Sequence, residues 1–126
     1  MTVYDIYESV TAGFAAPAEE QSRFSVDLER YIVEQPVSTV LVKVKGDSMI
    51  NAGIFPGDIA VVDKAKAPKQ GDIIIANIDY QYTIKYLEVD SQWRTYLRAA
   101  NDNYINMYPD QELQVFWVLK TIIRKY

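Results

Sequence analysis

The clearest structural pattern of the chain lies in residues 73–89, which read Ile73-Ile74-Ile75-Ala76-Asn77-Ile78-Asp79-Tyr80-Gln81-Tyr82-Thr83-Ile84-Lys85-Tyr86-Leu87-Glu88-Val89. Two runs rich in β-branched and aromatic residues, 73–78 and 81–89, flank a tight connection at Asp79-Tyr80. Such runs predict two neighbouring β-strands. Successive side chains of a strand point to opposite faces, so Ile84 and Lys85 are expected on different faces of the second strand.

Further short β runs lie on both sides of this pair, at 39–44, 59–63, 93–98 and 115–123. Turn-forming residues separate them, as in Pro56-Gly57-Asp58 and Pro68-Lys69-Gln70-Gly71-Asp72. Residues 100–109 read as a loop. Several short strands joined by turns predict a mainly β domain whose antiparallel sheets are curled.

The N-terminal part differs from this β region. Residues 1–24 show no sustained period and contain a small-residue segment with a proline, 12–18, which favours extended or irregular backbone. Residues 25–35 read as one short helix, with Ser25 as N-cap, Pro36 as terminator and an apolar stripe that we expect to pack in the core. We therefore expect an extended arm at 1–24 and a β domain at 25–126.

The composition narrows the possible chemistry. The 126 residues include neither cysteine nor histidine, which excludes disulfides, thiolate nucleophiles, the usual zinc sites and a Ser-His-Asp triad. A nucleophile must then be serine or threonine, and its base must be a lysine, a carboxylate or a terminal amine.

The charge and hydropathy patterns narrow the possible partners. The net charge is −4 and lysine and arginine form no dense block, so direct sequence-specific DNA binding is not expected. No apolar run reaches the ~18 residues of a membrane span, and the acidic start of the chain is not a signal peptide. We expect a soluble, cytoplasmic protein of one domain, with no membrane partner.

Two residues are candidates for nucleophilic chemistry. A strand-like run leads into Gly46-Asp47-Ser48, and a glycine turn at the end of a strand can hold a serine Oγ rigidly at an open edge. The same three residues favour ordinary turns, so composition alone also explains them. Lys85, taken alone, reads as an exposed strand lysine, although the flanking strands are strongly apolar.

Four blocks occur in one order: Gly46-Asp47-Ser48-Met49, then Gly57-Asp58-Ile59-Ala60-Val61-Val62-Asp63, then Gly71-Asp72-Ile73-Ile74-Ile75-Ala76, then Tyr82-Thr83-Ile84-Lys85-Tyr86-Leu87. In this order and spacing the chain resembles the LexA/UmuD family of self-cleaving serine peptidases (peptidase S24), and within it the UmuD-like branch. The resemblance covers about residues 11–123, and the separation of 85 − 48 = 37 residues between the serine and the lysine matches the family pattern. It implies a fold of the β-clip type, with curled antiparallel sheets, one short helix and an extended N-terminal arm.

The resemblance also implies roles for single residues. Ser48 corresponds to the nucleophile, Lys85 to the general base, and Ala12-Gly13 to the scissile bond. The UmuD-like branch most often has Cys-Gly at this bond, whereas Ala-Gly is common in LexA-like repressors, and alanine is small enough for the same pocket. The backbone N–H groups of Asp47 and Ser48 would hold the oxyanion.

The chemistry requires a neutral lysine, because an ammonium cannot accept a proton. A free lysine titrates near ~10.4, and burial can lower this pKa by up to about 3–5 units. Ile84, Leu87 and the Ile73–Ile75 run could supply that desolvation. The neighbours of the scissile bond, which are Val10, Thr11, Phe14 and Ala15, would fit the arm into the cleft.

The resemblance implies partners and biology as well. A RecA–single-stranded DNA filament would favour the cleavable state in the SOS response. The chain would form a homodimer and act as an accessory subunit with a UmuC-like Y-family polymerase subunit, without a cofactor or a metal. The alternatives are a non-enzymatic, dimeric polymerase-binding module with an idle dyad, a signal-peptidase-like enzyme acting on other chains, and a fragment of a phage-type repressor.

Overall fold

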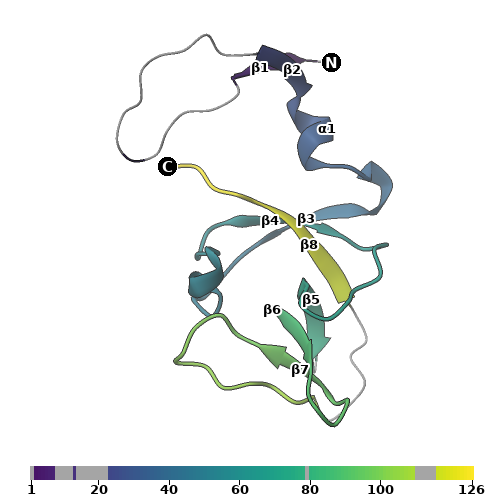
Figure 1. Cartoon of the computed structure of the whole chain (residues 1–126), viewed down its shortest axis with the longest axis vertical. Helices are drawn as coiled ribbons and strands as arrows, with labels where there is room; N and C mark the ends of the chain where they lie inside the picture. Colours follow the sequence, from purple (N-terminus) through teal and green to yellow (C-terminus); the bar gives the residue numbers. More distant parts are fainter. Residues whose placement is uncertain (1, 8–12, 14–22, 79, 110–115) are drawn as a thin grey trace. The chain divides into compact units, whose positions relative to one another are not determined.

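The computed structural model describes residues 2–7, 13, 23–78, 80–109 and 116–126 (Figure 1). The chain divides into two compact units, Met1–Glu34 and Gln35–Tyr126. Within the described ranges no helix has both the length and the apolar character needed to cross a membrane.

The first unit contains a two-stranded antiparallel ribbon followed by the helix. Strand β1, Val3–Tyr7, pairs with β2, Arg23–Asp27, with Val3 opposite Asp27. Regular structure thus begins inside the segment expected to be irregular. Alternating β-branched and aromatic residues such as Val3 and Tyr4 suit strand pairing.

Helix α1, Leu28–Ile32, is shorter than the expected helix at 25–35. Its N-cap is Asp27, whose side chain accepts a hydrogen bond from the Arg30 amide at 3.4 Å, and not Ser25 as predicted. Ser25 cannot take that place because it is held in β2, opposite Asp5. Leu28 is 48% exposed, so the apolar stripe of this helix does not form part of the core.

The second unit is one six-stranded sheet. Its strands are β3 (Thr39–Lys43), β4 (Ile59–Asp63), β5 (Ile73–Ile78), β6 (Gln81–Val89), β7 (Thr95–Arg98) and β8 (Phe116–Ile123). They pair in the order β3-β4-β8-β5-β6-β7, and every pairing is antiparallel. Among the described residues of this unit, two single-turn 3₁₀ helices accompany the strands, η1 (Pro36–Ser38) and η2 (Ile50–Ala52). The expected mainly β, antiparallel class is confirmed.

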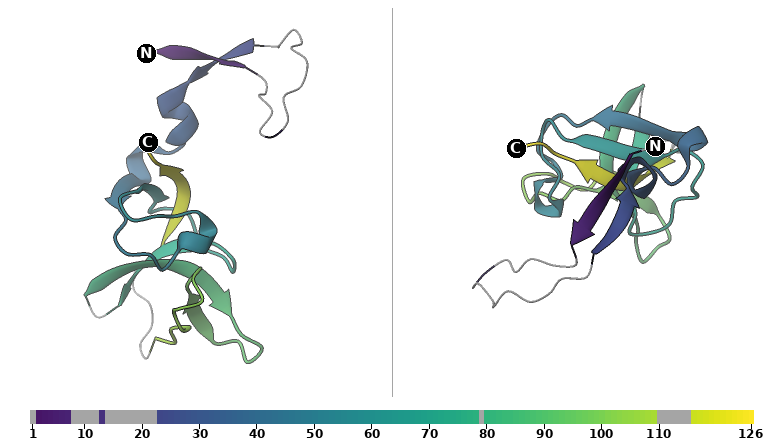
Figure 2. Two further views of the ribbon diagram at one scale, coloured as in Figure 1. Left: turned by 90° about the vertical axis from the view of Figure 1, so that its left-hand side faces the viewer. Right: turned by 90° about the horizontal axis from the view of Figure 1, so that it is seen from above.

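The sheet is strongly curved, so that β3 and β4 run in a different plane from β6 and β7 (Figures 1 and 2). The central strand β5 is consequently covered on both faces. Ile74 belongs to one core cluster and its neighbour Ile75 to the other, because successive side chains of a strand point to opposite faces of the sheet. This is why an unbroken apolar run, and no alternation, marks β5 in the sequence.

The larger cluster supports the region around the Gly46-Asp47-Ser48 turn. Its buried members are Val44, Met49, Ile54, Ala60, Val62, Ile75 and Ala100. Met49, directly after Ser48, is only 1% exposed and so anchors the turn in the core. The smaller cluster, on the opposite face of β5, contains Ile74, Ala76, Leu87, Leu97 and Val118.

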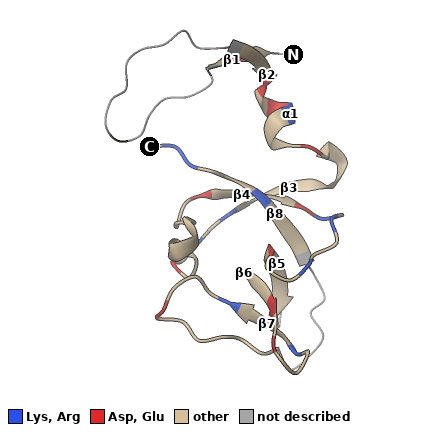
Figure 3. Ribbon diagram, in the orientation of Figure 1, with Lys and Arg blue, Asp and Glu red and all other residues tan. Residues whose placement is uncertain are grey.

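Charged residues of the second unit are interspersed in sign along its strands and loops (Figure 3). In one ion pair of this unit, the carboxylate is buried and the guanidinium is partly exposed. Arg124 Nε and Nη2 each lie 2.6 Å from an oxygen of Asp58, whose side chain is almost fully buried. Arg124 Nη2 also donates to the Gly53 carbonyl at 2.7 Å. The contact joins the chain after β8 to the turn before β4.

Candidate active site

Ser48 and Lys85 meet in the second unit. Lys85 Nζ lies 2.9 Å from Ser48 Oγ, within hydrogen-bond distance, although the residues are 37 positions apart. Ser48 stands in the turn between β3 and η2, and Lys85 stands in β6 opposite Ile74 of β5. The two predicted residues are therefore brought together by the fold.

The backbone of the serine turn explains how this side chain is presented. Gly46 has φ +77°, a left-handed conformation that residues with a side chain rarely adopt. The chain leaves β3 through Val44, whose amide donates to the Asp58 carbonyl at 2.9 Å, and re-enters the core at Met49. Ser48 is thus held between two buried anchors, while the turn itself faces a cavity.

Lys85 is held by acceptors other than the serine. Its Nζ lies 2.8 Å from Thr83 Oγ1, the hydroxyl two residues earlier on the same strand face, and 3.1 Å from the Ile84 carbonyl. The residue is 7% exposed. These contacts aim the amine at Ser48 Oγ and leave it little rotational freedom.

The surroundings of Lys85 disfavour its charged form. Burial lowers the pKa of the amine below its ordinary value, because desolvation penalises the ammonium. None of the described carboxylates forms an ion pair with it that would restore the charge. A lysine in this setting can be neutral at a pH where an exposed lysine is protonated, which is the property a general base needs.

A cavity of about 310 Å³ opens beside the pair. Its walls combine the Lys45–Ser48 turn with apolar side chains from the curved sheet, among them Val44, Ile75 and Ile84. The amides of Asp47 and Ser48 donate to no backbone carbonyl of the described residues, so they are available as donors beside the cavity. Within the same residues no group of three or more carboxylates is placed to hold a metal ion.

The predicted scissile bond is only partly described. Ala12 lies outside the described residues, as do Val10, Thr11, Phe14 and Ala15. Gly13 is described, with φ +139° and open space where a Cβ would stand. The assignment of Ala12-Gly13 as a cleavage site stays a prediction.

Three residues of the site were not identified from the sequence. Thr83 lies two positions before Lys85, so strand alternation could have identified it. Asn101 Nδ2 donates to the Asp47 carbonyl at 2.9 Å, and Tyr104 Oη donates to Asp47 Oδ1 at 2.6 Å. These contacts bridge 54 and 57 positions, and no local pattern in the sequence points to them.

Comparison with known proteins agrees with the four sequence blocks. A family model described as Peptidase S24-like matches residues 5–120. Protein SamA of Salmonella typhimurium strain LT2 is 41% identical over 118 residues, which cover 94% of this chain and 82% of that protein. Protein ImpA of Escherichia coli is 34% identical over 116 residues, covering 90% and 78%. The LexA repressor of Alcanivorax borkumensis is 38% identical over 95 residues, covering 75% of this chain and 46% of the repressor.

Proposed function

The chain belongs to the Peptidase S24-like family, and on that premise we propose that it cleaves its own Ala12-Gly13 bond with Ser48 as nucleophile and Lys85 as general base. The observation that carries the proposal is the 2.9 Å contact between Ser48 Oγ and the buried Lys85 Nζ. Members of the family are generally self-cleaving serine peptidases. The cavity lined by Ser48 and Lys85 gives a peptide room to approach.

The reaction begins with a neutral Lys85. Its lone pair takes the hydroxyl proton of Ser48 while Oγ attacks the carbonyl carbon of Ala12. Negative charge then develops on the carbonyl oxygen, and the amides of Asp47 and Ser48, two residues that line the cavity, would donate hydrogen bonds to it.

Collapse of the tetrahedral species breaks the bond between Ala12 and Gly13. The Lys85 ammonium gives its proton to the leaving Gly13 nitrogen, and Ala12 remains attached to Ser48 as an ester. Lys85, neutral again, takes a proton from a water molecule that attacks the ester carbonyl. The bond between this carbonyl carbon and Ser48 Oγ then breaks, and the Lys85 ammonium returns its proton to Oγ. The products are residues 1–12 with a free carboxylate and residues 13–126 with a new amino terminus.

Self-cleavage happens once per chain, so its control matters more than its speed. We propose that the arm enters the cleft only in a minor state, and that a RecA–single-stranded DNA filament shifts the population toward it in the SOS response. The cleaved chain would act as a homodimer with a UmuC-like Y-family polymerase subunit in translesion synthesis. The similarity to UmuD-like relatives such as SamA and ImpA supports this assignment.

Intact-mass measurement of the purified full chain tests the cleavage. Incubation at alkaline pH, or with RecA filaments, should remove residues 1–12, and Ser48→Ala or Lys85→Ala should each abolish this loss. Ser91→Ala and Lys69→Ala alter exposed residues of the same types and should cleave normally. A folded wild type that stays intact under both conditions would reject self-cleavage and favour a binding module with an idle dyad.

A further inference from the structure

The residue before the nucleophile is held by a loop from a distant part of the chain. Tyr104 Oη donates to the Asp47 carboxylate at 2.6 Å, and Asn101 Nδ2 donates to the Asp47 carbonyl at 2.9 Å. On the other side of the same loop, the Asn51 amide donates to the Ala100 carbonyl at 2.8 Å. The loop therefore contacts the chain both before and after Ser48.

Hydrogen bonds within this loop orient Asn101 toward Asp47. Asn101 is 8% exposed, and its Oδ1 accepts a hydrogen bond from the Asn103 amide at 3.0 Å, which orients Nδ2 toward Asp47. The Tyr104 amide donates to the Asn101 carbonyl at 3.1 Å. Asp47 gains much less support from its own turn, where the Ile50 amide lies 3.3 Å from the Asp47 carbonyl.

The two reacting groups are thus fixed from different sides. Thr83 and the Ile84 carbonyl accept hydrogen bonds from the Lys85 amine, whereas Asn101 and Tyr104 donate to Asp47 in the serine turn. The position of Ser48 Oγ depends on the backbone of Asp47, because rotation there would move Oγ away from Nζ. A displacement of about 1 Å in such a pair can cost on the order of 100-fold in rate.

We propose that Tyr104 is a positioning residue, which through its hydrogen bond to Asp47 keeps the Ser48 turn at the distance where Oγ meets Lys85 Nζ. The inference rests on the proposed self-cleavage. Tyr104 is 45% exposed and Tyr104→Phe keeps the aromatic ring, so this substitution should change the stability of the fold little. The Asp47 carboxylate raises the pKa of Tyr104 above its ordinary value, which keeps the hydroxyl protonated as a donor in alkaline solution.

A double-mutant cycle on the full chain tests this role. Tyr104→Phe and Asp47→Ala should each lower the plateau rate of self-cleavage by about tenfold, and the double variant should be no slower than either. Asp47→Asn keeps an oxygen acceptor and should retain several-fold more rate than Asp47→Ala. Labelling of Ser48 by a small fluorophosphonate should fall in parallel, because that reaction does not require the arm.

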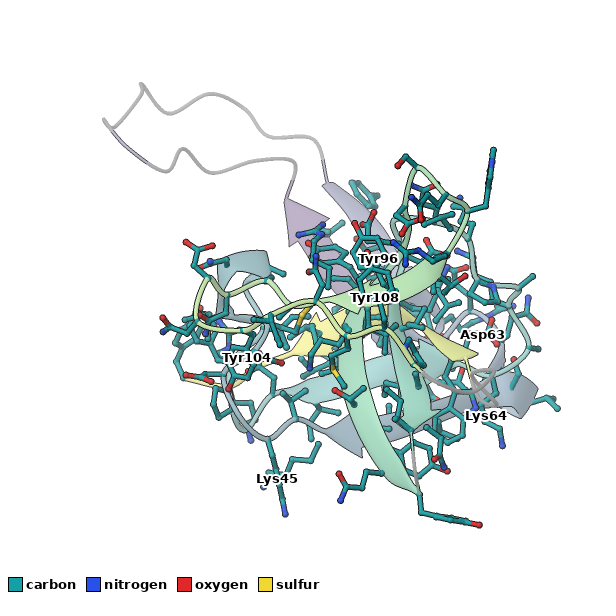
Figure 4. All side chains as sticks on the ribbon, turned by 90° about the horizontal axis from the view of Figure 1, so that it is seen from below. Lys45, Asp63, Lys64, Tyr96, Tyr104 and Tyr108 are labelled. Atoms are coloured by element: carbon teal, nitrogen blue, oxygen red, sulfur yellow. The ribbon has the colours of Figure 1, made fainter. Side chains whose placement is uncertain are left out.

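Tyr108→Phe is the matched control. Tyr108 belongs to the same connection between β7 and β8, stacks on Tyr96 with ring centroids 5.1 Å apart, and has its hydroxyl 3.4 Å from Asp90 (Figure 4). Tyr108→Phe should leave the rate of self-cleavage and the rate of Ser48 labelling unchanged. The pH of half-maximal cleavage provides a second control, because a loosened pocket would hydrate Lys85 and raise this pH, whereas misplacement of Ser48 lowers only the plateau.

The outcomes separate the two proposals. The positioning role alone is overturned if the Tyr104→Phe variant cleaves itself and is labelled at the wild-type rate. It is also overturned if the loss of rate in the double variant equals the product of the losses in the two single variants. A raised pH of half-maximal cleavage in Tyr104→Phe also overturns it, in favour of general support of the pocket. A folded wild type that neither cleaves nor labels overturns the proposed self-cleavage, and the positioning role with it.

Discussion

Replacing Lys85 by methionine should abolish cleavage and remove a pH-dependent cost to the fold. Methionine has a similar length but no charge, so it can occupy the site of a side chain that is only 7% exposed. Burial lowers the pKa of Lys85 in the folded chain, whereas in the unfolded chain the amine titrates near ~10.4. The folded state therefore loses the proton first as pH rises.

The magnitude follows from this difference in proton binding. Below the folded-state pKa both states are protonated, and the cost of burial is present in full. Between the folded-state pKa and ~10.4 only the unfolded chain holds the proton, so stability relative to the methionine variant rises by about 1.4 kcal/mol per pH unit. Above ~10.4 both states are neutral and the difference is constant again.

Urea unfolding over this pH range measures the effect. Ser48→Ala is the proper background, since it prevents cleavage at alkaline pH, and it is compared with the Ser48→Ala/Lys85→Met double variant. Other titrating groups cancel in the difference between the two. In the wild type, the cleavage rate should rise about tenfold per pH unit and level off at the pH where the stability difference begins to climb. A difference that stays flat from neutral pH to ~10.4, or a rate that levels off only there, would refute a buried neutral lysine.

Further outcomes follow from the core and from one buried ion pair. Leu97→Ala, at a fully buried position, should lower the free energy of unfolding by about 2–5 kcal/mol, while Leu41→Ala, at a residue 61% exposed, should change it far less in the same urea titration. Met49→Ala should cost a similar amount to Leu97→Ala and also slow self-cleavage, because Met49 anchors the serine turn, and a variant that is destabilised yet cleaves normally would contradict this. Arg124 lowers the pKa of Asp58 from 3.8 to about 2. The stability lost in Arg124→Gln should thus be full above pH 3.8 and shrink as pH falls toward 2, which acid unfolding followed by circular dichroism can check.

The strands could be predicted closely because their signals are local. The runs at 59–63, 73–78 and 81–89 coincide with β4, β5 and β6. The helix was predicted less well, since Ser25 is as good an N-cap by type as Asp27. The choice between them depends on pairing of β2 with β1, whose strands lie far apart in the sequence. A local reading has no access to that pairing.

The residue types available for the chemistry can be read directly from the amino-acid sequence. Without histidine or cysteine, a serine nucleophile needs a lysine, a carboxylate or a terminal amine as its base, and the glycine turn before Ser48 was visible in the chain. The 2.9 Å contact between Lys85 and Ser48, the burial of the Lys85 amine and the hydrogen bonds from Tyr104 and Asn101 to Asp47 arise only in the folded chain. The reason is physical: residue type is local, whereas distance and desolvation arise when a curved sheet brings together segments 37 to 57 positions apart.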